Sequence, residues 1–151
     1  MLEGWLAWHR QTLLGKCAGL TAEQLKQAAV EPSNLTLLGL LRHMTAVERS
    51  WFRIRAAGQD LPDPYNDDTN IDGDFDDVPT ADAEANYAAH LAELKVATAD
   101  VAALPLDHEF TLEGRGTFSL RWVYLHMIEE YARHNGHADL IRERLDGTTG
   151  S

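Results

Sequence analysis

A stripe of polar side chains with metal-binding chemistry runs along residues 120–145. Within it, His126, Glu130, His134 and His137 follow one another at steps of four, four and three residues. Residues at such steps lie on one face of an α-helix, which places Glu130 and His134 ~6 Å apart along the axis. A carboxylate and an imidazole at this spacing can bind one divalent ion through bonds of ~2.0–2.2 Å.

Apolar residues on the same segment indicate that this stripe lies beside the core. They are Trp122, Val123, Leu125, Ile128, Tyr131, Ala132 and Leu140. A polar group buried there without a partner would cost ~1–3 kcal/mol, so the stripe must be satisfied by an ion or by its own members. We predict an ion, and a His–Glu–His hydrogen-bond network without metal is the alternative.

A third ligand is expected on residues 35–57. His43 falls among apolar residues that recur at three- and four-residue steps, as one helix face requires; these are Leu40, Val47, Trp51 and Ile54. Two histidines and one carboxylate form an open site that leaves coordination positions for water or substrate. The predicted metal ligands are therefore His43, Glu130 and His134.

Other polar residues are candidates for roles around the metal. His126 and His137 are predicted to carry protons or to orient the ligands. Arg42, Arg121 and Arg133 are nearby cations that can pair with a substrate carboxylate, although each also suits a solvated helix face. Three further histidines have no comparable neighbours and are expected on the surface or in loops: His9, His90 and His108.

Four long helical patterns must position these residues, which predicts an all-α four-helix bundle forming one domain over residues 1–151. The patterns cover residues 2–18, 35–57, 80–103 and 120–145. Trp5 and Trp8 are expected on the apolar face of the first pattern. The expected N-caps are Thr80 and Ser119 for the last two patterns and Thr21, with Gln24 in a capping box, for a short helical piece.

Residues 106–118 are expected to be extended, as a hairpin before the last helix. Residues 58–79 form a long acidic crossover that is rich in aspartate and proline. Its centre matches the start of a calcium loop at Asp68, Asn70, Asp72 and Gly73, but Pro79 occupies the position of the closing glutamate. We expect a solvated loop, with calcium binding at 68–76 as the lesser alternative. Three of its residues are expected to pack inward: Tyr65, Ile71 and Phe75.

Composition excludes several classes of protein. The formal net charge of −11 disfavours binding to nucleic acid and to anionic membrane surfaces. No apolar run approaches the ~20 residues that cross a bilayer, and the opening residues lack the pattern of a signal peptide. The single cysteine, Cys17, allows no disulfide within the chain and suits a small buried hydrophobe. A cytoplasmic location is predicted.

Three segments resemble the DinB/YfiT-like superfamily of metal-binding helical bundles. The first is LTLLGLLRHMTAVERSWF, residues 35–52, which carries the single histidine of the second helix. The second is the acidic loop that follows it. The third is LHMIEEYARHNGHADLIRERLDG, residues 125–147, with a Glu-x-x-x-His pair and with Gly136-His137 where Gly-Gln is common. The chain is most similar to the actinobacterial branch of mycothiol-dependent maleylpyruvate isomerase and related thiol transferases.

The resemblance implies helices wound up, down, down, up, one bound metal (zinc or nickel) and a homodimer. It also implies a thiol of the mycothiol type as co-substrate and a small-molecule electrophile, which together make a metal-dependent thiol S-transferase or isomerase. The short start and the lack of the isomerase's extra C-terminal domain weaken the isomerase expectation. A non-catalytic metal- or ligand-binding bundle, for sensing, storage or structure, is the alternative.

Overall fold

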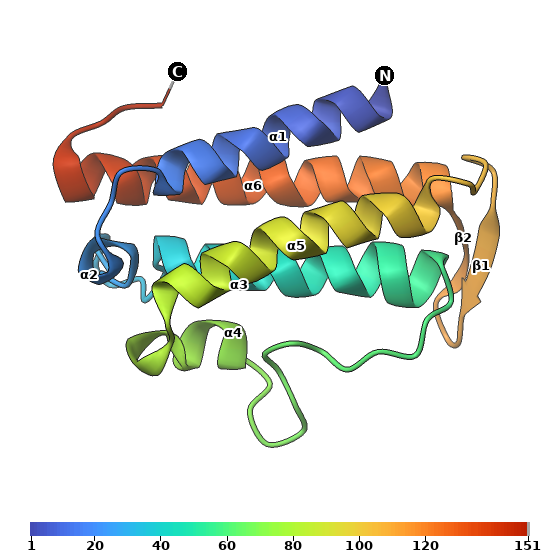
Figure 1. Ribbon diagram of the computed structural model, residues 1–151, viewed down its shortest axis with the longest axis horizontal. Helices are drawn as coiled ribbons and strands as arrows, with labels where there is room; N and C mark the ends of the chain where they lie inside the picture. Colours follow the sequence, from blue (N-terminus) through green and yellow to red (C-terminus); the bar gives the residue numbers. More distant parts are fainter. Residues whose placement is uncertain (151) are drawn as a thin grey trace.

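The computed structural model describes residues 1–150, and helices dominate it (Figure 1). The long helices are α1 (Leu2–Cys17), α3 (Leu37–Glu48) continued by η1 (Arg49–Ala56), α5 (Ala83–Val101) and α6 (Leu120–Asp146). The short elements are α2 (Ala22–Leu25), α4 (Gly73–Asp76), η2 (Val78–Thr80), β1 (Glu109–Leu112) and β2 (Gly116–Ser119). The mainly helical character is as expected. Within this described part of the chain, no helix combines the length and the apolar character needed to span a membrane.

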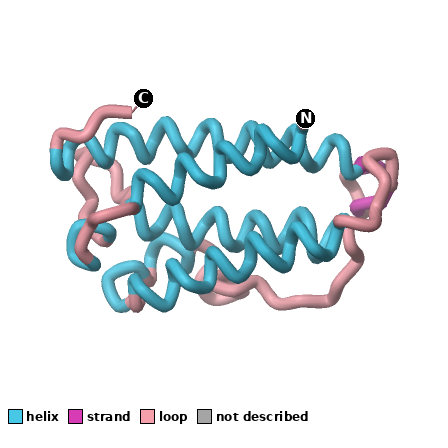
Figure 2. Tube along the Cα trace, turned by 45° about the horizontal axis from the view of Figure 1, so that its top comes forward, coloured by secondary structure: helices cyan, strands magenta, loops and turns pink. Residues whose placement is uncertain are grey.

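The long helices lie side by side in two closely packed pairs. Helix α1 packs along α6, and α3 with η1 packs along α5, while α3 also contacts α6. Figure 1 shows α1 and α6 running in one direction and α3 and α5 in the other. The antiparallel hairpin β1–β2 closes one end of the helices, and the acidic loop returns along the outside of α3 (Figure 2). This arrangement brings the middle of α3 against the middle of α6.

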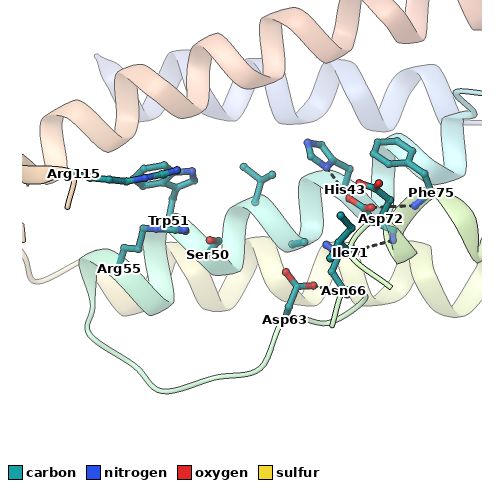
Figure 3. Close-up of a pocket in the computed structure, with 13 residues that line it drawn as sticks. His43, Ser50, Trp51, Arg55, Asp63, Asn66, Ile71, Asp72, Phe75 and Arg115 are labelled. Carbon is teal, nitrogen blue, oxygen red and sulfur yellow. Dashed lines mark hydrogen bonds and ion pairs between the residues drawn. The ribbon is translucent and has the colours of Figure 1, made fainter. Parts of the chain in front are cut away.

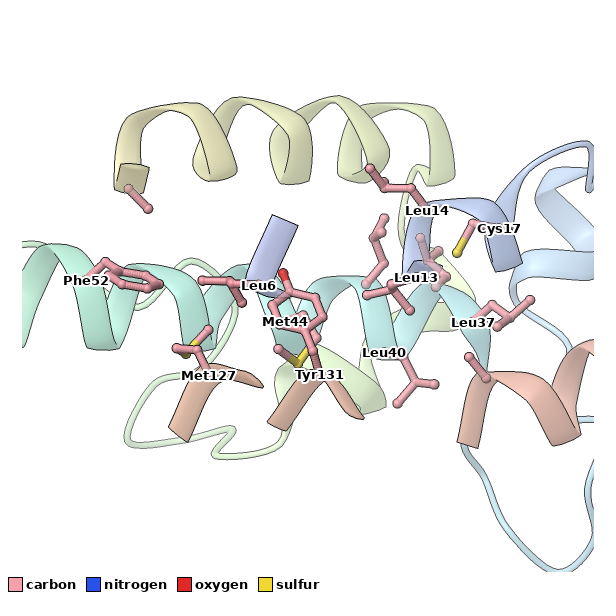
Figure 4. Packing of buried hydrophobic residues seen from close by; sticks show 14 of the residues in the cluster. Leu6, Leu13, Leu14, Cys17, Leu37, Leu40, Met44, Phe52, Met127 and Tyr131 are labelled. Atoms are coloured by element: carbon pink, nitrogen blue, oxygen red, sulfur yellow. The ribbon is translucent and has the colours of Figure 1, made fainter. Parts of the chain in front are cut away.

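The core between the helices is built mostly from leucine, methionine and aromatic side chains (Figure 4). Leu6 and Leu13 of α1 are fully buried, as are Met44 of α3 and Met127 of α6. Burying each such side chain contributes roughly 1.5–3 kcal/mol of transfer free energy. The helix faces that carry polar ligands are therefore held at fixed positions by the apolar contacts beside them.

One helix start and one helix type differ from the sequence predictions. The third long helix begins after Asp82, whose carboxylate accepts a hydrogen bond from Ala85 N, whereas Thr80 lies in the 3-10 turn η2. The second long helix changes from α to π geometry at Arg49, a wider turn that is often found near functional sites. The caps at Ser119 and Thr21 are confirmed.

Seven apolar residues that were predicted to face inward are instead exposed: Trp5, Trp8, Ile71, Trp122, Leu125, Ala132 and Leu140. In α1 the buried face is set by Leu6, Leu13 and Cys17. Adjacent helix positions are rotated by ~100°, so the tryptophan next to Leu6 points away from the core. The sequence contained two plausible apolar faces, and the tryptophans marked the wrong one.

A buried ion pair joins three helices near the centre of the bundle. Arg10 of α1 donates two hydrogen bonds of 2.7 Å to the fully buried carboxylate of Glu48 on α3. The hydroxyl of Tyr131 on α6 donates a third at 2.8 Å. Because each carboxylate oxygen has a donor, the buried charge is compensated, and the three helices are fixed in register around it.

His90 is buried in α5, so its expected surface position was wrong. The Thr45 hydroxyl donates to Leu41 O and therefore accepts from His90 Nδ1 at 2.9 Å. His90 Nε2 has no partner within residues 1–150. Burial, with a smaller effect from the positive charge of Arg10, lowers the pKa of His90 to about 4.

The neutral state of His90 predicts a stability loss in acid. Between the ordinary pKa of 6.5 and the folded value of about 4, the unfolded chain binds a proton that the folded chain excludes. The free energy of unfolding should therefore fall as the pH drops, by about 2 kcal/mol at His90 between pH 7.5 and pH 5. Urea unfolding of wild type and His90→Gln across this pH range measures the contribution of His90 to the free energy of unfolding. Equal pH dependence in both proteins would refute this prediction.

Candidate metal centre

The structure brings His43 of α3 together with Glu130 and His134 of α6. One potential ligand atom from each lies within 4.8 Å of the other two. His134 Nε2 is 3.5 Å from Glu130 Oε2, and two ligands at ~2.1 Å from a tetrahedral zinc lie ~3.4 Å apart. The donor types and the separation therefore fit one divalent ion. All three side chains are partly exposed, so the ligand atoms are accessible from the surface.

The acidic loop fixes the orientation of His43. Nδ1 of His43 lies 2.8 Å from Oδ2 of Asp74, a buried carboxylate on α4. Since an ionised carboxylate only accepts, Nδ1 carries the proton and Nε2 keeps its lone pair. The ring of Phe75 stacks on His43 with centroids 5.3 Å apart. A carboxylate behind a ligating histidine is a common device for setting the tautomer and increasing ligand basicity.

Arg42 ties the same loop to α3 and holds Asp74 in place. It is buried and donates hydrogen bonds of 2.9 Å to the carbonyl oxygens of Asp74 and Gly73 and to Asn86 of α5. Its guanidinium also stacks on Tyr65. A Cβ on Gly73 would lie 2.3 Å from the Tyr65 carbonyl, so this close approach requires glycine. Arg42 therefore has a structural role here, in place of the expected contact with a substrate.

His134 is neutral at ordinary pH and has a second histidine behind it. Burial, with smaller effects from charge on His43, His137 and Arg133, lowers the pKa of His134 to about 4. A neutral imidazole is the form that binds a metal. His134 Nδ1 lies 3.4 Å from His137 Nδ1. If His134 donates this contact, its Nε2 lone pair is directed toward Glu130.

His126 lies one turn before Glu130 and borders the other side of that carboxylate. Its Nε2 is 3.6 Å from Glu130 Oε1. The imidazole stacks on Trp122 and meets Trp51 edge to face, with centroids 4.8 and 4.7 Å away. His126, Glu129 and Glu130 form a second group with metal-ligand atoms close together. Arg133 contacts both carboxylates and compensates part of their charge.

The remaining predicted cations are engaged elsewhere. Arg121 is exposed and pairs with Asp107, and Arg133 pairs with Glu129 and Glu130 on its own helix. Burial raises the pKa of Cys17 to about 12, which keeps the chain's own thiol protonated. In residues 1–150, neither group of close metal-ligand atoms includes an aspartate of the predicted calcium segment 68–76.

A cavity of about 350 Å³ opens beside His43 and extends along α3 and η1. Its near end carries His43, Asp72 and Asp74, and its far end carries Arg55 and Arg115 (Figure 3). Its middle is mixed, with Val47 and Ile71 beside the polar side chains of Ser50, Asp63 and Asn66. The acidic loop forms one wall. A small molecule in this cavity would therefore lie against the candidate metal ligand of α3.

Asp74 is the residue of this site that sequence reasoning missed. It stands 31 positions from His43 in a loop crowded with other aspartates, and no local spacing distinguishes it. The only available signal was its position directly after Gly73, where the loop forms a short helical turn. Arg55 and Arg115 were missed because they come from different elements that meet only in the folded chain.

Comparison with known proteins assigns the chain to a family. No curated protein matches it, and no solved structure matches it either. The model of a family described as mycothiol-S-transferase matches residues 1–147, nearly the whole chain. This match agrees with the superfamily and the mycothiol branch that the three segments resemble. The chain belongs to the mycothiol S-transferase family.

Proposed function

We propose that the protein is a metal-dependent S-transferase that joins a thiol of the mycothiol type to a small electrophile. The observation that carries this proposal is an open two-histidine, one-carboxylate site at the end of a cavity, in a chain of this family. His43, Glu130 and His134 would hold one zinc or nickel ion. When bound, such an ion lowers the pKa of a thiol and keeps its sulfur as thiolate near neutral pH.

The protein's own residues would supply orientation and proton transfer. Asp74 would keep the proton of His43 on Nδ1, and His137 would accept a hydrogen bond from Nδ1 of His134, which leaves both Nε2 lone pairs free for the metal. His126, whose Nε2 lies 3.6 Å from Glu130 Oε1, would accept the thiol proton. His137 is then a positioning residue, whereas the sequence left its role open between proton transfer and orientation.

The reaction balances without any other co-reactant. The thiol loses its proton, the sulfur electron pair forms the new carbon–sulfur bond, and the leaving group departs with the pair of the broken bond. The buried, protonated thiol of Cys17 takes no part.

Thiol binding to the Co²⁺-substituted protein tests this proposal. Soft thiolate sulfur binds such ions well, so mycothiol should produce a new near-ultraviolet charge-transfer band, and a chloromethyl aryl electrophile should then be consumed with formation of the thioether. The His126→Gln variant should keep the band but lose most of the rate. A loaded protein that shows no band with mycothiol would contradict the proposal and favour a non-catalytic metal-binding bundle.

A further inference from the structure

Two arginines meet at the end of the cavity that is remote from His43. Arg55 belongs to η1, and Arg115 belongs to the turn between β1 and β2. Both line the cavity together with Trp51 (Figure 3). The Arg55 guanidinium lies over the Trp51 ring, 4.5 Å from its centroid. Arg55 is half-buried and Arg115 is exposed, so the two cations flank the far end of an open cavity.

Neither guanidinium is neutralised within residues 1–150. Neighbouring arginines of η1 have carboxylate partners, since Arg49 pairs with Glu93 and Arg53 with Glu93 and Asp100. Arg55 and Arg115 form no comparable ion pair in this part of the chain. Burial and the repulsion from Arg115 both lower the pKa of Arg55. Two adjacent uncompensated cations in a chain of net charge −11 indicate a place for an anion from outside.

The position of the arginines defines the shape of the molecule that carries this anion. The Arg55 guanidinium lies 4.5 Å from the centroid of the Trp51 ring. The Trp51 and His126 ring centroids are 4.7 Å apart. Nε2 of His126 in turn lies 3.6 Å from Oε1 of Glu130. Two rings thus separate the cations from the candidate metal ligands. Between the two ends, Ala46, Val47 and Trp51 form an apolar strip on one side of the cavity, and Ser50, Asp63 and Asn66 add polar groups.

We propose that Arg55 and Arg115 bind the carboxylate of the electrophilic substrate and so select for anionic electrophiles, a proposal that rests on the S-transferase function above. The substrate is an aromatic or apolar body with its reactive carbon at one end and its carboxylate at the other. A planar guanidinium binds carboxylate through two parallel hydrogen bonds. The reactive carbon then lies toward His43, where the thiolate attacks it.

A matched pair of electrophiles tests this selection. With mycothiol and the metal-loaded protein, 4-(chloromethyl)benzoate should give kcat/KM about 10-fold or more above that of 4-(chloromethyl)benzamide, as expected for a charged hydrogen-bonded pair. In both cases a carbon–sulfur bond forms, and chloride leaves with the electrons of the carbon–chlorine bond. Arg55→Gln and Arg115→Gln should raise KM for the benzoate about 10-fold and have a much smaller effect on the benzamide reaction. Arg144→Gln, which removes an exposed arginine of α6, is the control.

Equal kcat/KM for the two electrophiles in the wild type would overturn the proposal, as would variants that lower both reactions equally. If neither electrophile reacts, the S-transferase function fails, and binding of the unreactive 4-methylbenzoate still tests the anion site. Tryptophan fluorescence should report its binding to the wild type and at least ~10-fold weaker binding to the double variant. Equal affinity of 4-methylbenzoate and 4-methylbenzamide would exclude the site independently of turnover.

Discussion

Replacing His134 by alanine is expected to abolish thiol transfer. The variant loses one of the three proposed metal ligands, and with it the bound ion that would hold the thiol as thiolate beside the cavity. Effective molarities for well-placed reacting groups reach on the order of 10⁵ M or more, so a decrease of about 10³-fold in kcat/KM is a conservative expectation. Initial rates of thioether formation with saturating metal measure it.

His108→Ala is the matched control for this substitution. His108 also has a partly buried imidazole, and its Nε2 contacts the carbonyl of Ala56, but it lies in the segment before β1 and outside the ligand group. Its rate should stay close to that of wild type. If His134→Ala retained wild-type activity while remaining folded, His134 would be excluded as a ligand, and the His–Glu–His network without metal would be favoured.

Asp74→Asn should weaken metal binding although Asp74 is not a proposed ligand. The asparagine keeps the size of the side chain and can accept from His43 Nδ1, but it removes the negative charge that strengthens His43 as a ligand. Removing such a partner typically reduces metal affinity by about 10–100-fold. Competition with a chromophoric chelator measures the affinity of the purified apoprotein for Zn²⁺.

The control for Asp74→Asn is Asp76→Asn on the same short helix. Asp76 is exposed, so its substitution removes the same charge at a greater distance from His43. Its affinity for Zn²⁺ should match wild type. If both variants bound Zn²⁺ equally well, the Asp74–His43 contact would have no influence on the metal site, and the role of the acidic loop would need another explanation.

The sequence was informative wherever one helix carried the whole signal. Glu130 and His134 are four residues apart, so helical geometry alone placed them on one face, and the single histidine among the apolar residues of the second helix identified His43. Ser119 and Thr21 signalled their helix starts through local hydrogen bonding. These predictions depended on contacts within a few residues, which the sequence displays directly.

The sequence was uninformative where the site depends on contacts between distant segments. Asp74 contacts His43 in a loop that Arg42 binds to α3 through hydrogen bonds. In the sequence, Arg42 resembled a free surface cation. His90 was misassigned because its buried position depends on Thr45 of α3. Two apolar faces competed in α1, and only packing against α6 decides between Trp5 and Leu6.

Metal analysis of the purified protein tests the three-ligand site most directly. Inductively coupled plasma mass spectrometry of wild type, His43→Ala and His134→Ala should find a single equivalent of zinc or nickel per wild-type chain and strongly reduced metal in both folded variants. A wild-type protein that stays metal-free after incubation with Zn²⁺ and Ni²⁺ would contradict the site. His43, Glu130 and His134 would then form a partly buried hydrogen-bond network without metal.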